Sequence, residues 1–200
     1  ACKPSVLEGS SNEEFSVNAA KEWYYGVFKK SAEYALNNIK LKGDKSPTWN
    51  NAKYEKFGDI EVIEIPLSME RKLVSIPNFA NQNNEDKKRI AQATINNLLI
   101  IRLPSKEIIV REIQYIPEID YLRSKNFDIS HLYYKAIDKE FDGIITIKKW
   151  NGERVNKYKL VDGLIKSKVK KGIKKITNNE RTSEEFPHSP RFWPSLRLGN

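Results

Sequence analysis

The chain has 200 residues, of which 39% are hydrophobic and 10% aromatic, so disorder throughout is excluded. This length suits one domain with extensions, or at most two small domains. The net charge of +9 permits binding to nucleic acid, anionic lipid or acidic polymers, although lysine-rich solubility is the interpretation we favour.

Two further classes are excluded by what the sequence lacks. No run approaches the ~18 apolar residues that a membrane-spanning helix needs. The single cysteine cannot form an internal disulfide or a cysteine-based zinc site.

The position of that cysteine predicts a lipid anchor. Cys2 follows Ala1, and Ala-Cys is the pair that surrounds the cleavage point of a bacterial lipoprotein signal. The mostly polar stretch Lys3–Asn12 is typical of a short tether, and we assign residues 1–15 to it. A cloning remnant before a free thiol is the alternative. We expect export, lipidation at Cys2 and a membrane partner reached through that lipid.

Residues 16–39 predict a long amphipathic helix around which the domain is organised. Ser11 and Glu14 could form a capping box, or Ser16 could cap a shorter helix, and Gly43 is the expected stop. A stripe that contains three aromatic side chains needs a large apolar partner. The apolar residues recur at spacings of three and four: Ala20, Trp23, Tyr24, Val27, Phe28, Ala35, Leu36 and Ile39.

Five stretches before residue 118 predict β-strands from their β-branched or alternating apolar content. In the second of them the alternation slips at Val62-Ile63, which indicates either burial on both faces or a bulge, and Pro66 favours an edge or a strand end. Asn78–Asn97 is expected to be a surface excursion, with a helical turn. The five predicted strands are Lys53–Phe57, Ile60–Leu67, Arg71–Ile76, Leu98–Leu103 and Glu107–Ile116.

The second half predicts a covering segment followed by a meander. Glu118–Lys139 is too apolar for a free loop, so we expect it to cover the sheet, partly as helix. Three antiparallel strands then follow within Phe141–Lys170. Asn151-Gly152 predicts a type I′ hairpin turn, and Asp162-Gly163 a second tight turn.

These elements predict an α+β fold. A long N-terminal helix packs on a curved antiparallel meander sheet of six to eight strands, loosely cystatin-like. Residues 16–176 form this single domain, and the Pro-rich residues 177–200 form an extended tail. The helix residues Trp23, Val27, Phe28 and Leu36 are expected to be buried against Ile63, Ile65, Leu99, Ile101, Ile113 and Ile145.

A run of lysines closes the predicted domain. Without interleaved arginine and aromatic residues it does not predict nucleic-acid binding. We favour an edge strand protected from self-pairing by lysine. Contact with anionic lipid headgroups is the alternative, which makes candidate anion contacts of Lys166, Lys168, Lys170, Lys171, Lys174 and Lys175.

No catalytic motif is present, since the chain contains no Walker loop, Gly-x-Gly-x-x-Gly, Gly-x-Ser-x-Gly or His-Glu-x-x-His. His131, near Ser130 and Asp128, is expected to be partly buried with a local hydrogen bond rather than part of a triad, and His188 lies in the tail. Carboxylate pairs such as Glu61 and Glu64 are expected to be isolated surface acids. We therefore predict no enzyme activity, no cofactor and no metal.

Several short motifs resemble a group of bacterial cell-envelope lipoproteins without an established function. The resemblance covers about Ala19 to Lys170 and implies a secreted protein, lipid-anchored in the outer membrane of a double-membraned bacterium. It implies no functional residues. The motifs are Ala20–Tyr24, Pro47–Ala52, Glu61–Leu67, Ile113–Pro117 and Phe141–Ile147.

Three classes of function follow. A non-catalytic, envelope-anchored binding or scaffold module is the leading hypothesis. A protease-inhibitor or propeptide-like module is the second, and it would expose Asn78–Asn97 or the Pro-rich tail. An uncatalogued hydrolase is the third, and it would gather His131 with two acids in a polar cleft.

Overall fold

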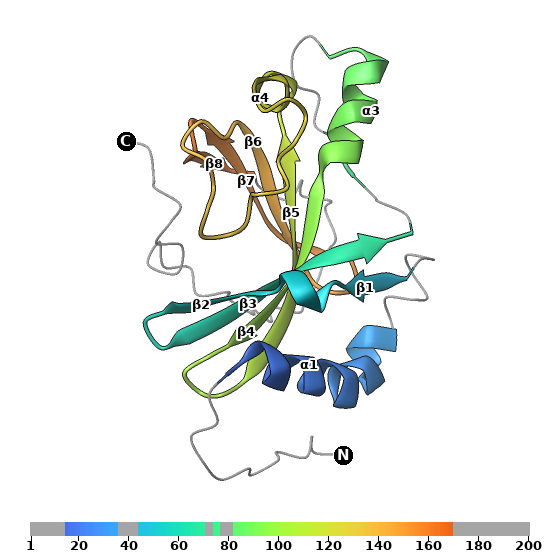
Figure 1. The fold of residues 1–200 in the computed structure, drawn as a ribbon, viewed down its shortest axis with the longest axis vertical. Helices are drawn as coiled ribbons and strands as arrows, with labels where there is room; N and C mark the ends of the chain where they lie inside the picture. The colour runs from blue at the N-terminus through green and yellow to red at the C-terminus, as the bar shows by residue number, and fades with distance from the viewer. Residues whose placement is uncertain (1–14, 36–43, 71–73, 77–81, 170–200) are drawn as a thin grey trace, which may run out of the picture.

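The computed structural model describes residues 15–35, 44–70, 74–76 and 82–169, and its centre is an eight-stranded antiparallel sheet (Figure 1). The strand order is β1-β3-β4-β5-β6-β7-β8, and β2 also pairs with β3. From β3 onward each strand therefore pairs with the next in sequence, as the predicted meander requires. The strands are β1 (Lys45–Pro47), β2 (Lys53–Phe57), β3 (Ile60–Met69), β4 (Ile95–Arg102), β5 (Ile108–Pro117), β6 (Gly143–Lys148), β7 (Arg154–Val161) and β8 (Leu164–Lys168).

The helices are short and cover different parts of the curled sheet. In Figure 1, α1 lies along one end of the molecule, and α3 and α4 lie at the other end. The predicted α+β fold, a helix packed on a curved antiparallel sheet, is confirmed. The helical elements are α1 (Val17–Gly26), the 3₁₀ turns η1 (Phe28–Lys30) and η2 (Trp49–Asn51), α3 (Asn84–Ala93) and α4 (Ile119–Ser124).

The first helix is shorter than predicted because the stretch contains two N-caps. Ser16 caps α1, with its Oγ accepting the Ala19 N–H at 3.1 Å. The helix ends at Gly26, and the Oγ of Ser31 then accepts the Tyr34 N–H at 3.2 Å as a new helical turn begins. A serine that bonds the backbone in this way starts a helix rather than continuing one.

This interruption changes which side chains of the apolar stripe are buried. Phe28 is 3% exposed, whereas Val27 is 47% exposed and Trp23 is half-buried, so the expected burial of Val27 is wrong. Leu36 lies outside the described residues. Trp23, Val27 and Ile108 line an open hollow of about 680 Å³ between α1 and β5, the α1 groove.

The central strands bury both of their faces, so the slip at Val62-Ile63 is double-sided burial and not a bulge. One cluster, on the helix face, joins Tyr24, Phe28 and Trp150 to Ile63, Ile65, Leu98, Ile100 and Val110. The other cluster, on the opposite face, contains Val62, Leu99, Ile101, Ile113 and Ile145. The expected packing of α1 on Leu99, Ile101, Ile113 and Ile145 is wrong, because successive side chains of a strand point to opposite faces.

Two connecting segments form the cover of the opposite face. The excursion at Asn78–Asn97 contains the full helix α3, whose N-cap Asn83 accepts the Asp86 N–H at 2.8 Å through Oδ1. After β5, α4 and the chain that follows it bury Leu122, Ile129 and Leu132, which confirms the predicted covering segment. Of the predicted strand 71–76, residues 74–76 have no regular structure, and the remainder lies outside the described residues.

Both predicted hairpin turns occur, but the type I′ geometry is found at Asp162-Gly163 and not at Asn151-Gly152, for which it was predicted. At Asn151-Gly152 only the glycine has a positive φ, 81°, which excludes type I′. The turn instead carries Trp150 into the helix-face cluster, where it is 0% exposed. Asp162 and Gly163 have φ values of 51° and 67°, and a Cβ at Gly163 would lie 2.5 Å from the Asp138 carbonyl oxygen.

The ends of the described chain bear on the predicted domain boundaries. Phe15, the last residue of the predicted tether, is 4% exposed and belongs to the helix-face cluster. β8 is the last strand of the sheet path, and Lys166 and Lys168 on it are exposed.

None of the described helices is long and apolar enough to span a membrane. Outside the described residues lie Cys2, Lys170, Lys171, Lys174, Lys175, His188, the capping box and the tail.

Candidate functional site: a pocket beside Glu64

Glu64 is buried in the middle of β3, with 4% of its surface exposed. Its neighbours Ile63 and Ile65 belong to the helix-face cluster, so Glu64 projects from the opposite face. The segment after α4 covers that face. The expectation that Glu64 is an isolated surface acid is therefore wrong, and the reason is burial of β3 on both sides.

The Glu64 carboxylate accepts three hydrogen bonds from three different parts of the fold. Its Oε1 accepts from Asn97 Nδ2 at 2.6 Å and from the Tyr115 hydroxyl at 2.9 Å. Its Oε2 accepts from the Tyr134 backbone N–H at 2.7 Å. These bonds join β3 to β4, to β5 and to the covering segment, so the carboxylate has a fixed position.

The surroundings of Glu64 disfavour its negative charge. Burial raises the pKa of Glu64, and the hydrogen bonds from Asn97, Tyr134 and Tyr115 offset that effect only in part. Burial and the nearby Glu64 charge likewise raise the pKa of the Tyr115 and Tyr134 hydroxyls. A carboxyl with a raised pKa inside a folded protein marks a candidate functional site.

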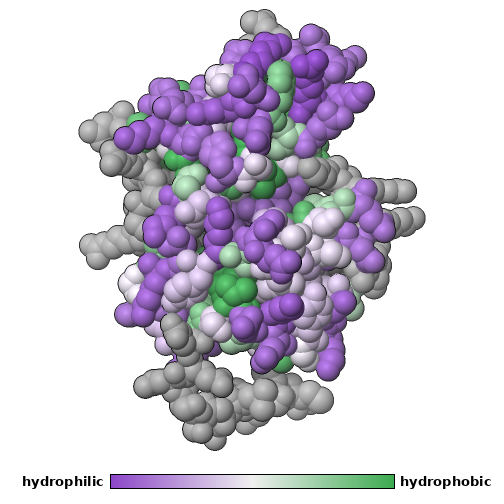
Figure 2. Space-filling model, viewed as in Figure 1, coloured by the Kyte–Doolittle hydropathy of each residue, from purple (hydrophilic) through white to green (hydrophobic). Residues whose placement is uncertain are grey.

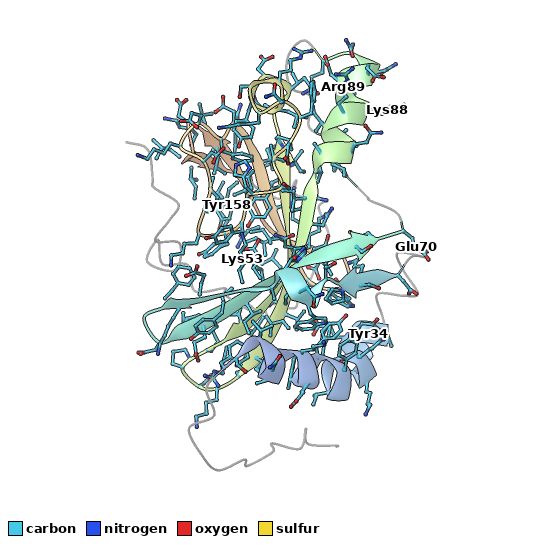
Figure 3. The ribbon with its side chains drawn as sticks, in the orientation of Figure 1. Tyr34, Lys53, Glu70, Lys88, Arg89 and Tyr158 are labelled. Carbon is cyan, nitrogen blue, oxygen red and sulfur yellow. The ribbon has the colours of Figure 1, made fainter. Side chains whose placement is uncertain are left out.

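One lysine lies close enough to Glu64 to stabilise its charged form. Lys53 on β2 is the cross-strand partner of Glu64, and its Nζ lies 3.6 Å from the centre of the Tyr133 ring. Figure 3 shows Lys53, from β2, and Tyr158, from β7, near the middle of the molecule. The site is thus made of one carboxyl, one ammonium and several tyrosines brought together by the curled sheet.

A pocket of about 610 Å³ opens beside Glu64. Its buried lining includes Glu64, Asn97 and Leu132, and its exposed lining includes Lys53 and Ser130, with Asn50 and Asn51. Ligand-binding pockets commonly have about 300–1,000 Å³. The face of the molecule drawn in Figure 2 is largely hydrophilic, with scattered hydrophobic patches.

One polar atom of this lining lacks a partner. Among the described residues, Asn97 Oδ1 is buried and accepts no hydrogen bond, while its amide nitrogen is held by Glu64. A buried acceptor left without a donor costs about 1–3 kcal/mol. Because this atom is buried, a donor from a ligand would recover that free energy only after the side chains around Asn97 move to expose it.

The raised pKa of Glu64 predicts a pH-dependent stability. Folding favours the protonated form of Glu64, so protonated Glu64 contributes to the stability of the fold. This contribution to stability is complete below the ordinary pKa of 4.5 and is lost as the pH rises through the raised folded-state pKa. The stability of the wild type relative to Glu64→Gln should therefore fall as the pH increases, by at most about 1.4 kcal/mol per pH unit. Urea unfolding of both proteins across this pH range measures the difference.

Glu61, on the same strand, is a control because its pKa is shifted in the opposite direction to that of Glu64. Although burial opposes the change, hydrogen bonds from Tyr54 and Arg102 lower its pKa. The stability that Glu61 adds to the wild type, relative to Glu61→Gln, should be constant above pH 4.5. It should be lost as the pH falls through the lowered folded-state pKa of Glu61. Parallel curves for the two variants would contradict our description of Glu64.

His131 does not lie where the sequence predicted. It is exposed rather than partly buried, and its Nε2 lies 3.0 Å from Asp138 Oδ2. Although burial opposes it, hydrogen bonds from Tyr121, Lys125 and His131 lower the pKa of Asp138 to about 2. The local hydrogen bond expected for His131 is thus made with Asp138, and Asp128 accepts the Ser130 backbone N–H. Ser130 lines the Glu64 pocket and His131 does not, so the two form no catalytic pair there.

Sequence analysis missed the residues that make this site. Asn97, Tyr115 and Tyr134 come from three distant segments, and their convergence depends on strand register. One local signal existed, an acid between two isoleucines in a strand whose alternation had already slipped. Among the described residues no group of three or more His, Cys, Asp or Glu could hold a metal ion.

Comparison with known proteins yields no family, curated protein or solved structure that matches the chain. The interpretation of the pocket therefore rests on its own residues and their geometry.

Proposed function

We propose that the chain is a non-catalytic binding module, carried at the cell envelope by a lipid on Cys2, whose pocket beside Glu64 holds a neutral saccharide. The observation that supports this best is the 610 Å³ pocket, whose described lining combines the polar side chains of Asn50, Asn51 and Ser130 with the apolar Leu132 and the ring of Tyr133. The envelope location rests on the Ala-Cys pair and on the resemblance to envelope lipoproteins.

The pocket lining favours a neutral ligand rich in hydroxyl groups. Asn50, Asn51 and Ser130 offer exposed polar groups to a ligand, and the Asn97 side chain lies below them with a buried Oδ1 that has no donor. Leu132 and the Tyr133 ring provide an apolar surface for the C–H face of a sugar. Among the described lining residues, Lys53 is the one cation and already lies over Tyr133, and the Glu64 carboxyl group already accepts three hydrogen bonds from the protein, so neither group selects a strongly charged ligand.

The arrangement of carboxyl groups supports binding rather than hydrolysis. Glycosidases use two carboxyl groups that flank the scissile bond at about 5–9.5 Å from each other. Among the described residues that line the pocket, Glu64 is the only acid. Its two oxygens already accept three hydrogen bonds, which leaves it poorly placed to transfer a proton to a ligand.

Titration calorimetry with N,N′-diacetylchitobiose and with maltose tests the proposal. The wild type should bind at least one of these sugars without cleaving it. Ser130→Trp should abolish that binding, because an indole at this exposed lining position fills the entrance of the pocket. His131→Trp places the same side chain one residue later, outside the lining, and should bind like the wild type.

Two outcomes would contradict the proposal. Equal binding by Ser130→Trp and the wild type would move the ligand away from this pocket. Cleavage of either sugar by the wild type would replace the non-catalytic module with the hydrolase hypothesis.

The lipid anchor has a separate test. Expression of the full gene in a bacterial host with radioactive palmitate should label the wild type and leave Cys2→Ser unlabelled. A wild type without label would contradict the envelope anchor and leave the pocket proposal standing.

A further inference from the structure

A second pocket, of about 420 Å³, opens on the sheet across β5, β6 and β7. Its lining includes Lys148, Arg154 and Lys157 together with Gln114 and Thr146. We call it the basic pocket. It contains none of the residues of the Glu64 pocket.

Strand register explains why the three cations meet. Gln114 pairs with Thr146, and Thr146 pairs with Lys157, so these three side chains share one face of neighbouring strands. Lys148 pairs with Arg154 after a shift of register that follows Ile147. This irregularity adds one residue to β7 and brings Arg154 opposite Lys148, as a β-bulge does.

The positive charge of the basic pocket is not balanced by its lining. Among its described lining residues there is no acid. Lys148 Nζ lies 4.0 Å from Glu112 Oε1. Glu112 already forms a shorter ion pair with Lys45, whose Nζ lies 2.7 Å from Glu112 Oε2. No described acid lies within ion-pair distance of Lys157.

The lysines of this pocket are also partly removed from water. The side chain of Lys148 is 17% exposed, and its Nζ donates to Gln114 Oε1 at 3.1 Å. Burial lowers the pKa of Lys148, an effect that Glu112 opposes and that Lys45 and Lys157 reinforce. Burial, and then Arg154, lower the pKa of Lys157. Like charges held together at such cost favour the arrival of an anion.

We propose that the basic pocket binds a phosphoryl group, with Lys148, Arg154 and Lys157 neutralising its charge and Thr146 offering a hydroxyl donor. Three cations suit a doubly charged oxyanion better than a single carboxylate. The volume leaves room for the rest of a phosphorylated molecule beside the group itself. A soluble phosphate monoester and the phosphomonoester headgroup of phosphatidic acid present the same chemistry here.

Titration calorimetry with inorganic phosphate, at an ionic strength held constant with sodium chloride, tests the site. The wild type should bind phosphate, and Lys157→Met should bind it about tenfold more weakly or worse, because one charged hydrogen bond is lost. Lys159→Met is the matched control, since Lys159 lies two residues further along β7, pairs with Glu118 at 3.6 Å and is absent from the lining. It should bind phosphate within twofold of the wild type.

Lys148→Met should show the same loss as Lys157→Met, provided that its circular dichroism spectrum matches that of the wild type. The more exposed Lys157 keeps the test valid if the Lys148 variant fails to fold. Equal losses in Lys157→Met and Lys159→Met would overturn the proposal, because they would show an effect of net charge alone.

A sedimentation assay with vesicles of phosphatidylcholine, with and without phosphatidic acid, distinguishes the two sources of the group. Binding that requires phosphatidic acid and is lost in Lys157→Met assigns a lipid headgroup to the pocket. Binding of inorganic phosphate without vesicle binding assigns a soluble phosphate. Absence of both overturns the proposal and leaves the saccharide pocket unaffected.

Discussion

Lys45→Met is expected to lower the free energy of unfolding by about 3–5 kcal/mol. Lys45 Nζ lies 2.7 Å from Glu112 Oε2, and both side chains are almost fully buried, with 2% and 3% exposed. The same ammonium donates to the Trp150 carbonyl at 3.1 Å and lies 4.8 Å from the Trp150 ring. Methionine keeps the apolar length of lysine but leaves the Glu112 carboxylate buried, and among the described residues its remaining cationic neighbour is Lys148, at 4.0 Å.

A double variant separates the ion pair from the packing. Lys45→Met with Glu112→Gln removes both charges, and it should recover much of the stability lost in the single variant, because desolvation of an unpaired charge is the main cost. Urea unfolding of the three proteins measures the coupling. A double variant no more stable than Lys45→Met would show that the loss arises from packing around Trp150.

Phe28→Ala is expected to cost about 3–5 kcal/mol, because it empties the middle of the helix-face cluster. Phe28 is 3% exposed, stacks on Trp23 at 5.8 Å between ring centres and meets Trp150 edge-on at 5.6 Å. Val27→Ala, one residue earlier and exposed, should change stability by less than about 0.5 kcal/mol. A loss below about 1 kcal/mol for Phe28→Ala would mean that the stripe does not pack on the sheet.

Local patterning predicted most of the strands, because β-branched or alternating apolar content can be seen within the sequence of each one. Lys53–Phe57 was predicted with the bounds that β2 has, and Ile60–Leu67 lies within β3. The covering segment after residue 117 was also predicted, since its apolar content exceeds what a free loop carries. These features depend on neighbours in sequence, which is the information that a single chain provides.

Features that depend on distant contacts were not predictable. The break after Gly26 depends on whether Ser31 caps a helix, and the alternation of one strand does not say which face α1 covers. Glu64 looked like a surface acid because the covering segment that contacts it, through the Tyr134 N–H, lies 70 residues later in the sequence. The basic pocket requires the register of β5, β6 and β7, including an irregularity that no local motif announces.

The central claim is that the pocket beside Glu64 holds a saccharide, and the backbone amide of Tyr134 reports on it directly because it donates to Glu64. Amide chemical shifts of the ¹⁵N-labelled protein, measured during separate titrations with N,N′-diacetylchitobiose and with maltose, are the most direct test. With at least one of the two sugars, we predict saturable shifts at Tyr134, Asn97 and Ser130. Absence of any shift with both sugars, or shifts centred on Trp23 and Val27 in the α1 groove, would contradict the claim.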